Sequence, residues 1–232
     1  EGGLFRSGDG GDSWARVGGG FPTGPVGRIG ITFCAGAPGT LYASAVGPDG
    51  GIFRSDDGGA TWERRNARIQ SHWFYGELVC DPADADRLYV PMTPLNVSED
   101  GGRTFRDLVR TAVHVDHHTL WVNPDDPEHL MVGNDGGVYV SRDRGEHWLW
   151  QSNVPVMQLY AAAVDMQEPF YHVYGGTQDN GSWGGPVGTR FSDGVSNEDW
   201  IFTAGGDGFH SQVDPTNPEI IYPESQYGVP YP

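Results

Sequence analysis

The chain has 232 residues, including 36 glycines and 17 prolines, and its 31 acidic residues against 14 arginines and no lysine give a net charge of −17. That charge disfavours nucleic acids and anionic membranes as partners and favours cations or neutral polymers. No hydrophobic run has membrane length, so membrane insertion is not expected. Helical periodicity is nearly absent, and the glycines and prolines predict many short strands joined by tight turns. An all-β fold is therefore expected.

One pattern, Ser-x-Asp-x-Gly-x-x-aromatic, occurs four times, and we call it the turn motif. Its copies cover residues 7–14, 55–62, 98–105 and 141–148, at spacings of 48, 43 and 43 residues. The Ser and Asp side chains can accept hydrogen bonds from turn amides, the glycine takes a positive φ, and the aromatic ring fills the gap towards the next repeat. Because an apolar segment precedes each copy, each is predicted to join two strands of a hairpin.

A second repeated element is a Pro-rich turn between two apolar segments, and it covers residues 81–89, 123–131 and 214–222. The 91 residues from Leu130 to Ile221 equal two repeats, so one copy has diverged. We place that copy at 171–174. Residues 177–183 then form its degenerate turn motif.

Each repeat thus supplies four strands, A to D, with the Pro-rich turn joining A to B and the turn motif joining C to D. Four-stranded repeats of about 45 residues are typical of β-propeller blades. The predicted blades are 26–66, 67–108, 112–151 and 156–195, with half-blades at 1–17 and 199–228. The half-blades either close a ring of five or belong to a larger propeller of about seven blades. We favour the larger ring because of the insertion at 184–200 and the abrupt end of the chain.

Strand parity assigns the connections to two faces. Consecutive strands run antiparallel, so the A–B and C–D turns share a lower face, while the B–C and D–A connections share an upper face. The predicted B–C loops are 43–51, 90–96, 133–137 and 175–181, and the connections into strand A are 67–76, 107–118, 151–158 and 184–207. His129 and His147 fall on the lower face and are predicted to be inert.

Residues 114–118, His-Val-Asp-His-His, are the densest group of proton-carrying and metal-capable side chains. On an extended strand, alternation would place His114, Asp116 and His118 on one face and His117 on the other. Three interpretations stay open. The three residues bind a divalent metal, or Asp116 holds a histidine in one tautomer for acid–base catalysis, or the group is a structural hydrogen-bonded network at the mouth of the channel.

Several other polar residues should face the same space: Asp135, Gln178, Asp179, Asn180, Asp207 and His72. The Asn-Asp-Gly context of Asp135 is also what a plain tight turn prefers. The three polar groups at 178–180 exceed what a turn requires. Asp207, between glycines, either approaches a ligand closely or occupies a bend. Trp73 is the best candidate for an exposed platform on which a sugar ring stacks.

The two cysteines, Cys34 and Cys80, occupy nearly equivalent places in successive repeats. This equivalence would put them on neighbouring strands. A disulfide and a pair of buried free thiols both fit this placement.

The turn motif is similar to the Asp-box, or bacterial neuraminidase repeat, and the chain resembles the superfamily of sialidases, xyloglucanase-type glycosidases and sortilin-type receptor propellers. The resemblance extends to bacterial sortilin-like, glycosyl-hydrolase-labelled secreted proteins through residues 116–121, 133–138, 174–181, 205–209 and 224–228. It implies a secreted or periplasmic β-propeller with its ligand on the upper face and with further propeller domains in the same protein.

The leading hypothesis for function is a protein that binds a carbohydrate on the upper face and hydrolyses it with paired carboxylates drawn from Asp116, Asp135, Asp179 and Asp207. The expected ligand-binding residues are His72, Trp73, His114, His118, Gln178 and Asn180. The alternative is a non-enzymatic, sortilin-like module that binds peptides or proteins. An enzyme predicts two carboxylates with separated pKa values across a cleft, whereas a receptor predicts an apolar groove.

Overall fold

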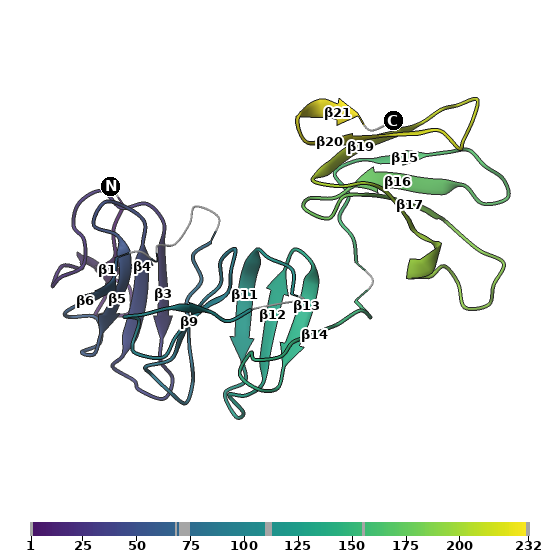
Figure 1. Ribbon diagram of the computed structural model, residues 1–232. Helices are drawn as coiled ribbons and strands as arrows, with labels where there is room; N and C mark the ends of the chain where they lie inside the picture. Colours follow the sequence, from purple (N-terminus) through teal and green to yellow (C-terminus); the bar gives the residue numbers. More distant parts are fainter. Residues whose placement is uncertain (1, 68, 70–74, 110–112, 155, 231–232) are drawn as a thin grey trace. The chain divides into compact units, whose positions relative to one another are not determined.

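The computed structural model describes residues 2–67, 69, 75–109, 113–154 and 156–230. The chain divides into two compact units, residues 1–154 and 155–232, which are described separately below. Figure 1 shows the first unit in purple to teal and the second in green to yellow. Both consist of antiparallel sheets, so the prediction of an all-β fold with four-stranded blades is confirmed.

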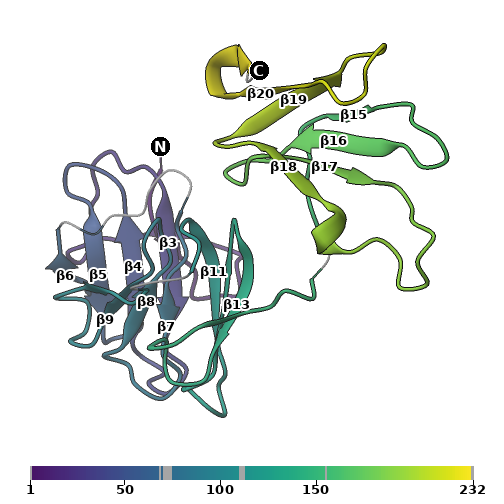
Figure 2. The ribbon, with the colours of Figure 1, turned by 45° about the vertical axis from the view of Figure 1, so that its right-hand side comes forward.

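The first unit contains three four-stranded sheets and one two-stranded sheet, each in sequence order. The strands are β1 (Phe5–Arg6), β2 (Ala15–Arg16), β3 (Ile29–Phe33), β4 (Leu41–Ala45), β5 (Gly51–Ser55), β6 (Glu63–Asn66), β7 (Val79–Cys80), β8 (Leu88–Val90), β9 (Asn96–Ser98), β10 (Arg106–Asp107), β11 (His117–Val122), β12 (Leu130–Asn134), β13 (Gly137–Ser141) and β14 (Leu149–Trp150). Figure 2 shows successive sheets of this unit side by side.

The core of the first unit lies between successive sheets, and strand alternation explains why. In β8, Leu88 and Val90 belong to the cluster shared with β4 and β5, whereas Tyr89 belongs to the cluster shared with β11 and β12. Successive side chains of a strand point to opposite faces, so one buried strand packs against both neighbouring blades. The second strands β4 and β8 are therefore buried at every position rather than at alternate ones.

All four turn motifs have one hydrogen-bond pattern, and each joins the third and fourth strands of a sheet or, at residues 7–14, β1 and β2. The Ser Oγ donates to the Asp Oδ1 over 2.7 to 2.9 Å. It also accepts the glycine amide four residues later at 2.8 Å. The Asp Oδ1 accepts the amide of the residue four positions after it at 2.9 Å. The Ser and Asp side chains therefore bond within their own motif, while in three copies the amide of the fourth motif residue donates to a carbonyl outside it, at Gly39, Asp86 or Glu128.

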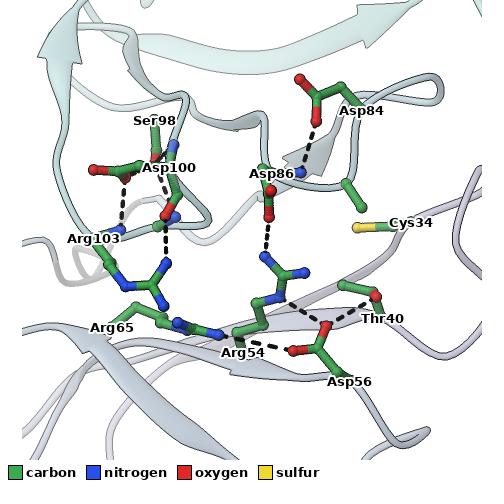
Figure 3. Close-up of polar contacts among 12 residues, drawn as sticks. Cys34, Thr40, Arg54, Asp56, Arg65, Asp84, Asp86, Ser98, Asp100 and Arg103 are labelled. Carbon is green, nitrogen blue, oxygen red and sulfur yellow. Dashed lines mark hydrogen bonds and ion pairs between the residues drawn. The ribbon is translucent and has the colours of Figure 1, made fainter.

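A polar contact joins the sheet β3–β6 to the following sheet at the turn-motif end. Arg54 donates to Asp56 at 2.8 Å and also contacts Asp86, which lies in the next repeat (Figure 3). The backbone of Gly101 completes the contact, since its amide donates to the Asp86 carbonyl oxygen at 2.9 Å. Gly101 has a φ of +72°, and a Cβ there would lie 2.6 Å from the Arg54 Nη1. The left-handed backbone favours glycine here, although Arg144 occupies the equivalent position of the last turn motif with a φ of +57°.

Cys34 and Cys80 form a disulfide with a Cα–Cα distance of 5.2 Å. Cys34 follows β3 and Cys80 ends β7, so the bond joins the first strands of two successive sheets. Of the two interpretations left open by the sequence, the disulfide is therefore the one that the structure contains. The bond closes a segment with a sequence separation of 46 residues.

The second unit contains one four-stranded and one three-stranded sheet. Its strands are β15 (Ala162–Val164), β16 (His172–Gly176), β17 (Ser182–Pro186), β18 (Ile201–Ala204), β19 (Gly208–Val213), β20 (Ile221–Ser225) and β21 (Val229–Pro230), with short 3₁₀ turns η1 (Asn197–Asp199) and η2 (Gln226–Gly228). Because Ile201–Ala204 pairs with β17, the predicted boundary between a blade at 156–195 and a half-blade at 199–228 is wrong. The first sheet extends to residue 204, and the last sheet has a third strand.

Two further assignments in the second unit are corrected. Residues 177–183 are not a turn motif between third and fourth strands, because 177–181 connect β16 to β17, the second and third strands. The insertion expected to lead into a first strand, at 184–207, instead lies mainly between β17 and β18 (Figure 2). In the other repeats a short turn motif separates the third strand from the fourth, and the prediction relied on it. Because a long connection replaces that motif here, β18 was not predicted.

Candidate functional site

Strand register separates the two ends of each sheet. In the sheet β11–β14, Leu130 pairs with Ser141 at the turn-motif end, while His117 and Gly137 both pair with Asn134 at the other end. We call this other end, which carries the connection between second and third strands, the loop end. The histidine-rich stretch thus lies opposite the turn motif, as strand parity predicts.

The stretch 114–118 is not an extended strand, which corrects one expectation. Strand β11 begins only at His117, and Asp116 has a φ of +62° in the left-handed region. Asp is one of the few non-glycine residues that enters this region readily. A register shift between His117 and Thr119 also breaks strict alternation.

His117 is the buried member of the group, with an exposed fraction of 1%. Burial lowers the pKa of its imidazole to about 4, so the ring is neutral near pH 7. Its backbone amide donates to the Met92 carbonyl oxygen at 3.0 Å, and its Nδ1 lies 3.4 Å from the Asn134 amide nitrogen. His117 therefore stabilises the junction between two sheets.

Asp116 points towards the preceding sheet. Its carboxylate accepts a hydrogen bond from Thr93 Oγ1 at 3.0 Å and another from the Tyr75 hydroxyl. Its backbone amide donates to the Thr93 carbonyl oxygen at 3.2 Å. Burial, and next the hydrogen bond to Asp116, raise the pKa of Tyr75, so the phenol is protonated near neutral pH.

His118 and Asp135 form the second half of the group. The His118 Nε2 lies 2.8 Å from the Asp135 Oδ1, and the His118 ring lies 5.6 Å from the Tyr75 ring between centroids. Carboxylate oxygens of Asp116 and Asp135 lie within 4.8 Å of each other. Tyr75, Asp116, His118 and Asp135 therefore form one connected cluster, which we call the β11 site.

His114 takes a different place from the one predicted. Its Nδ1 lies 3.0 Å from the Val115 carbonyl oxygen, and its Cβ packs against Gly136, where an added Cβ would approach to 2.4 Å. Within the described part of the chain, the ligand atoms of His114, Asp116 and His118 do not gather into a metal-binding group. The predicted three-ligand set is not assembled because the left-handed turn at Asp116 removes the alternation on which it depended.

Glu77 adds a carboxyl group beside the β11 site. Its Oε1 accepts a hydrogen bond from Thr119 Oγ1 at 3.2 Å, one residue after His118. Burial raises the pKa of Glu77, although the hydrogen bonds from Thr119 and from the Leu120 backbone oppose this. A carboxyl group with a raised pKa is suited to donate a proton.

A pocket of about 280 Å³ shares Thr93 with these contacts. Its lining is Thr93, Pro94, Asp107, Val109, Val113, Val115 and His117. Three valines and a proline make much of this lining apolar. The first unit therefore offers both a polar cluster and a small apolar recess at the loop end of its sheets.

Four other predicted site residues, Gln178, Asp179, Asn180 and Asp207, lie at the loop end of the second unit. The Asp207 carboxylate accepts the Asp179 amide at 2.7 Å and the side-chain amide of Gln226. Burial raises the pKa of Asp207, but these hydrogen bonds outweigh it and lower the pKa below its usual value. Asn180 Nδ2 donates to the Gln178 carbonyl oxygen at 3.1 Å. This second group links three connections of that unit, 177–181, 205–207 and 226–228.

Reasoning from sequence missed three residues of the first group, namely Tyr75, Thr93 and Glu77. Tyr75 lies 41 positions before Asp116 and meets it only because successive blades pack together. The one available signal is that Tyr75 and Glu77 lead into a predicted first strand. Predicted ligand residues His72 and Trp73 lie outside the described residues.

Known proteins resemble this chain only weakly, and only at the level of structure. No protein-family model matches the chain, and no curated protein matches it. Among solved structures, the chain is similar to the GH74 xyloglucanase from Xanthomonas campestris, at 16% identity and a TM-score of 0.46 over 84% of this chain and 34% of that one. It is also similar to a GH74 enzyme from Niastella koreensis, at 16% identity and a TM-score of 0.48 over 86% and 33% of the two chains.

A third similar structure is YCF48 from Cyanidioschyzon merolae, at 13% identity and a TM-score of 0.42 over 86% of this chain and 64% of that one. The chain spans about a third of the length of the two GH74 enzymes. Within the described residues, no helix is long and apolar enough to cross a bilayer.

Proposed function

We propose that the protein is a secreted or periplasmic Asp-box propeller that binds a neutral carbohydrate at the β11 site and hydrolyses its glycosidic bond. The observation that carries the proposal is the pairing of two carboxylates, Asp116 and Asp135, whose oxygens lie within 4.8 Å, beside the rings of Tyr75 and His118. Carboxylates accept hydrogen bonds from sugar hydroxyls, and aromatic rings offer faces on which a pyranose stacks.

The charge of the chain supports a neutral ligand. With a net charge of −17, the protein repels anionic polymers that approach within about one Debye length. The disulfide supports an oxidising compartment, because such bonds form and persist in secreted and periplasmic proteins. The hydrogen bonds that the Ser and Asp side chains repeat in the four turn motifs support an assignment to the Asp-box group.

The proposed hydrolysis uses two carboxyl groups in different roles. Asp116 attacks the anomeric carbon while Asp135, paired with His118, protonates the leaving glycosidic oxygen. A water molecule then gives its proton to Asp135, and its oxygen displaces Asp116 from the anomeric carbon. The short separation favours this double displacement, since single displacement needs carboxyl groups roughly 6.5–9.5 Å apart to admit the water. Glu77, with its raised pKa, is an alternative proton donor.

The test is isothermal titration of the chain with neutral hexasaccharides of the β-glucan and β-mannan types, followed by analysis of the products. We expect the double variant Asp116→Asn with Asp135→Asn to bind at least about tenfold more weakly, a loss of about 1.4 kcal/mol or more of binding free energy. The same variant should have no turnover. Asp125→Asn is the matched control, because Asp125 is exposed on the connection between β11 and β12, at the turn-motif end of the same sheet. Equal binding by the double variant and the control would exclude the β11 site.

A peptide-binding, sortilin-like module is the second candidate, and the apolar pocket favours it. In that case Val113→Ser and Val115→Ser would weaken capture of peptides with apolar side chains, and the Asp116 and Asp135 variants would not. A peptide library screened against the protein and both sets of variants separates the two functions.

A further inference from the structure

We infer that the second unit carries its own binding surface for a neutral pyranose chain, built on the exposed rings of Tyr160 and Tyr227 beside the polar loop 178–180. All of its residues belong to the second unit, and it shares only the carbohydrate class with the proposed function. Its position is the loop end of two successive sheets, where 177–181 connect β16 to β17 and η2 connects β20 to β21.

The exposure of Tyr227 is the first observation. Its exposed fraction is 99%, the largest among the exposed large hydrophobic residues of the described chain. Its φ is +66°, a backbone conformation that favours glycine, and Gly228 follows it with a φ of +72°. The ring is open to a ligand, and a non-glycine residue held in the left-handed region is a feature that clusters at binding sites.

The network beneath Tyr227 is the second observation. Its neighbour Gln226 donates to the Asp207 carboxylate, which also accepts the Asp179 amide at 2.7 Å. The amide of Gly181 donates to the Gly206 carbonyl oxygen at 2.9 Å. Three separate connections, 177–181, 205–207 and 226–228, are thereby tied together, so the position of Tyr227 relative to the polar loop is fixed before any ligand arrives.

Tyr160 supplies a second aromatic surface at the same end. Its amide donates to the Gly176 carbonyl oxygen at 2.9 Å, immediately before the polar loop. Its ring stacks on Phe209 with 5.0 Å between centroids and 6° between planes, which holds it rigidly. Its exposed fraction is still 54%. A ring supported on one face and open to solvent on the other is a preformed platform.

The polar groups at this loop end identify the ligand class. Gln178 and Asn180 carry amides that both donate and accept, and Asp179 carries a carboxylate that accepts. A pyranose offers hydroxyl groups at its rim and C–H bonds on its faces, so it matches amides flanked by aromatic rings. The carboxylates of Asp179 and Asp207 disfavour an anionic sugar.

The test uses the whole chain carrying Asp116→Asn and Asp135→Asn, so that binding at the β11 site is removed. Titration with a β-glucan hexasaccharide and a β-mannan hexasaccharide should still reveal one binding event. Adding Tyr227→Ala should weaken that event at least about tenfold. Tyr227→Phe should keep it within about twofold, because the ring is retained.

Two further variants keep the result interpretable. Tyr227→Gly relieves the backbone conformation while removing the ring, so it should lose binding with no loss of thermal stability. Tyr171→Ala removes a half-exposed ring near the opposite end of β16 and should leave affinity unchanged. Absence of any hexasaccharide binding in the starting variant, or unchanged affinity on Tyr227→Ala and Tyr227→Gly, would overturn the inference. Wild-type binding that disappears entirely with Asp116 and Asp135 would overturn it while leaving the proposed function intact.

Discussion

The two ends of the sheets in the first unit follow different rules. At the turn-motif end, four hairpins repeat the same hydrogen bonds to within 0.2 Å between Ser Oγ and Asp Oδ1. At the loop end, the side chains of Asp116 and His118 find partners on other segments. The repeated hydrogen bonds lie at the end that holds each blade together, whereas the long-range ones lie at the end where we propose that a ligand is recognised.

The largest expected effect concerns the aromatic residue of the turn motif. Trp62 has an exposed fraction of 6% and packs against Phe21, whereas Trp14 in another copy is 64% exposed. Trp62→Ala should therefore lower the free energy of unfolding by roughly 3–5 kcal/mol, and Trp14→Ala by under about 1 kcal/mol, in urea titrations. Both indoles donate to a motif glycine carbonyl, so equal losses would show that this hydrogen bond, rather than packing, is the source.

The disulfide should come next in size. Replacing Cys34 and Cys80 by Ala should lower the free energy of unfolding by about 2–4 kcal/mol, because the closed segment is long. Reductant should lower the stability of the wild-type protein by a similar amount and leave the double variant unchanged. A reductant effect of equal size in both proteins would contradict the assignment.

Acid should reduce the stabilising contribution of the turn-motif carboxylates more than that of the loop end. The hydrogen bonds of Thr61 and Ser55 lower the pKa of Asp57 to about 2 from its usual 3.8, and those of His147 and Ser141 do the same for Asp143. A carboxylate whose folded pKa is depressed stabilises the fold above pH 3.8 and loses that contribution as the pH falls towards 2. The urea midpoint should therefore fall between pH 4 and pH 2, and less steeply in Asp57→Asn than in Asp49→Asn.

The smallest stability effect is expected at the loop end. Asp135→Asn breaks a partly exposed pair with His118, and such pairs contribute about 0–1 kcal/mol. The melting temperature should therefore shift by no more than a few degrees while carbohydrate affinity falls. A large loss of stability would show that the β11 site is a structural network, the third interpretation of this stretch.

The same contrast explains what could be predicted. The turn motif is local, since Ser55 and Asp57 bond to residues no more than four positions away, so its pattern and spacing are visible in the sequence. The blade boundaries predicted in the first unit follow from the turn motif. In the second unit the long connection between β17 and β18 contains no turn motif, so the fourth strand was not recognised. The predicted end of that blade was therefore wrong.

The candidate site was predicted in part. Asp116, His118 and Asp135 were chosen from residue type and parity, and the structure brings these three side chains together. Their partner Tyr75 could not be paired from sequence, because the contact depends on packing between blades. The left-handed backbone of Asp116 is a single-residue choice that no periodicity reveals, and it is what separated His114 from the predicted group.

The connection between β17 and β18 offers a practical handle. It lies at the end of its sheet remote from the 177–181 loop, and residues 191–199 along it are exposed to solvent. Exposed connections of this kind tolerate inserted sequence better than any other part of a fold. A dye, an affinity tag or a tether to a solid support placed there would leave the loop end free, which suits single-molecule or surface-based measurement of ligand capture.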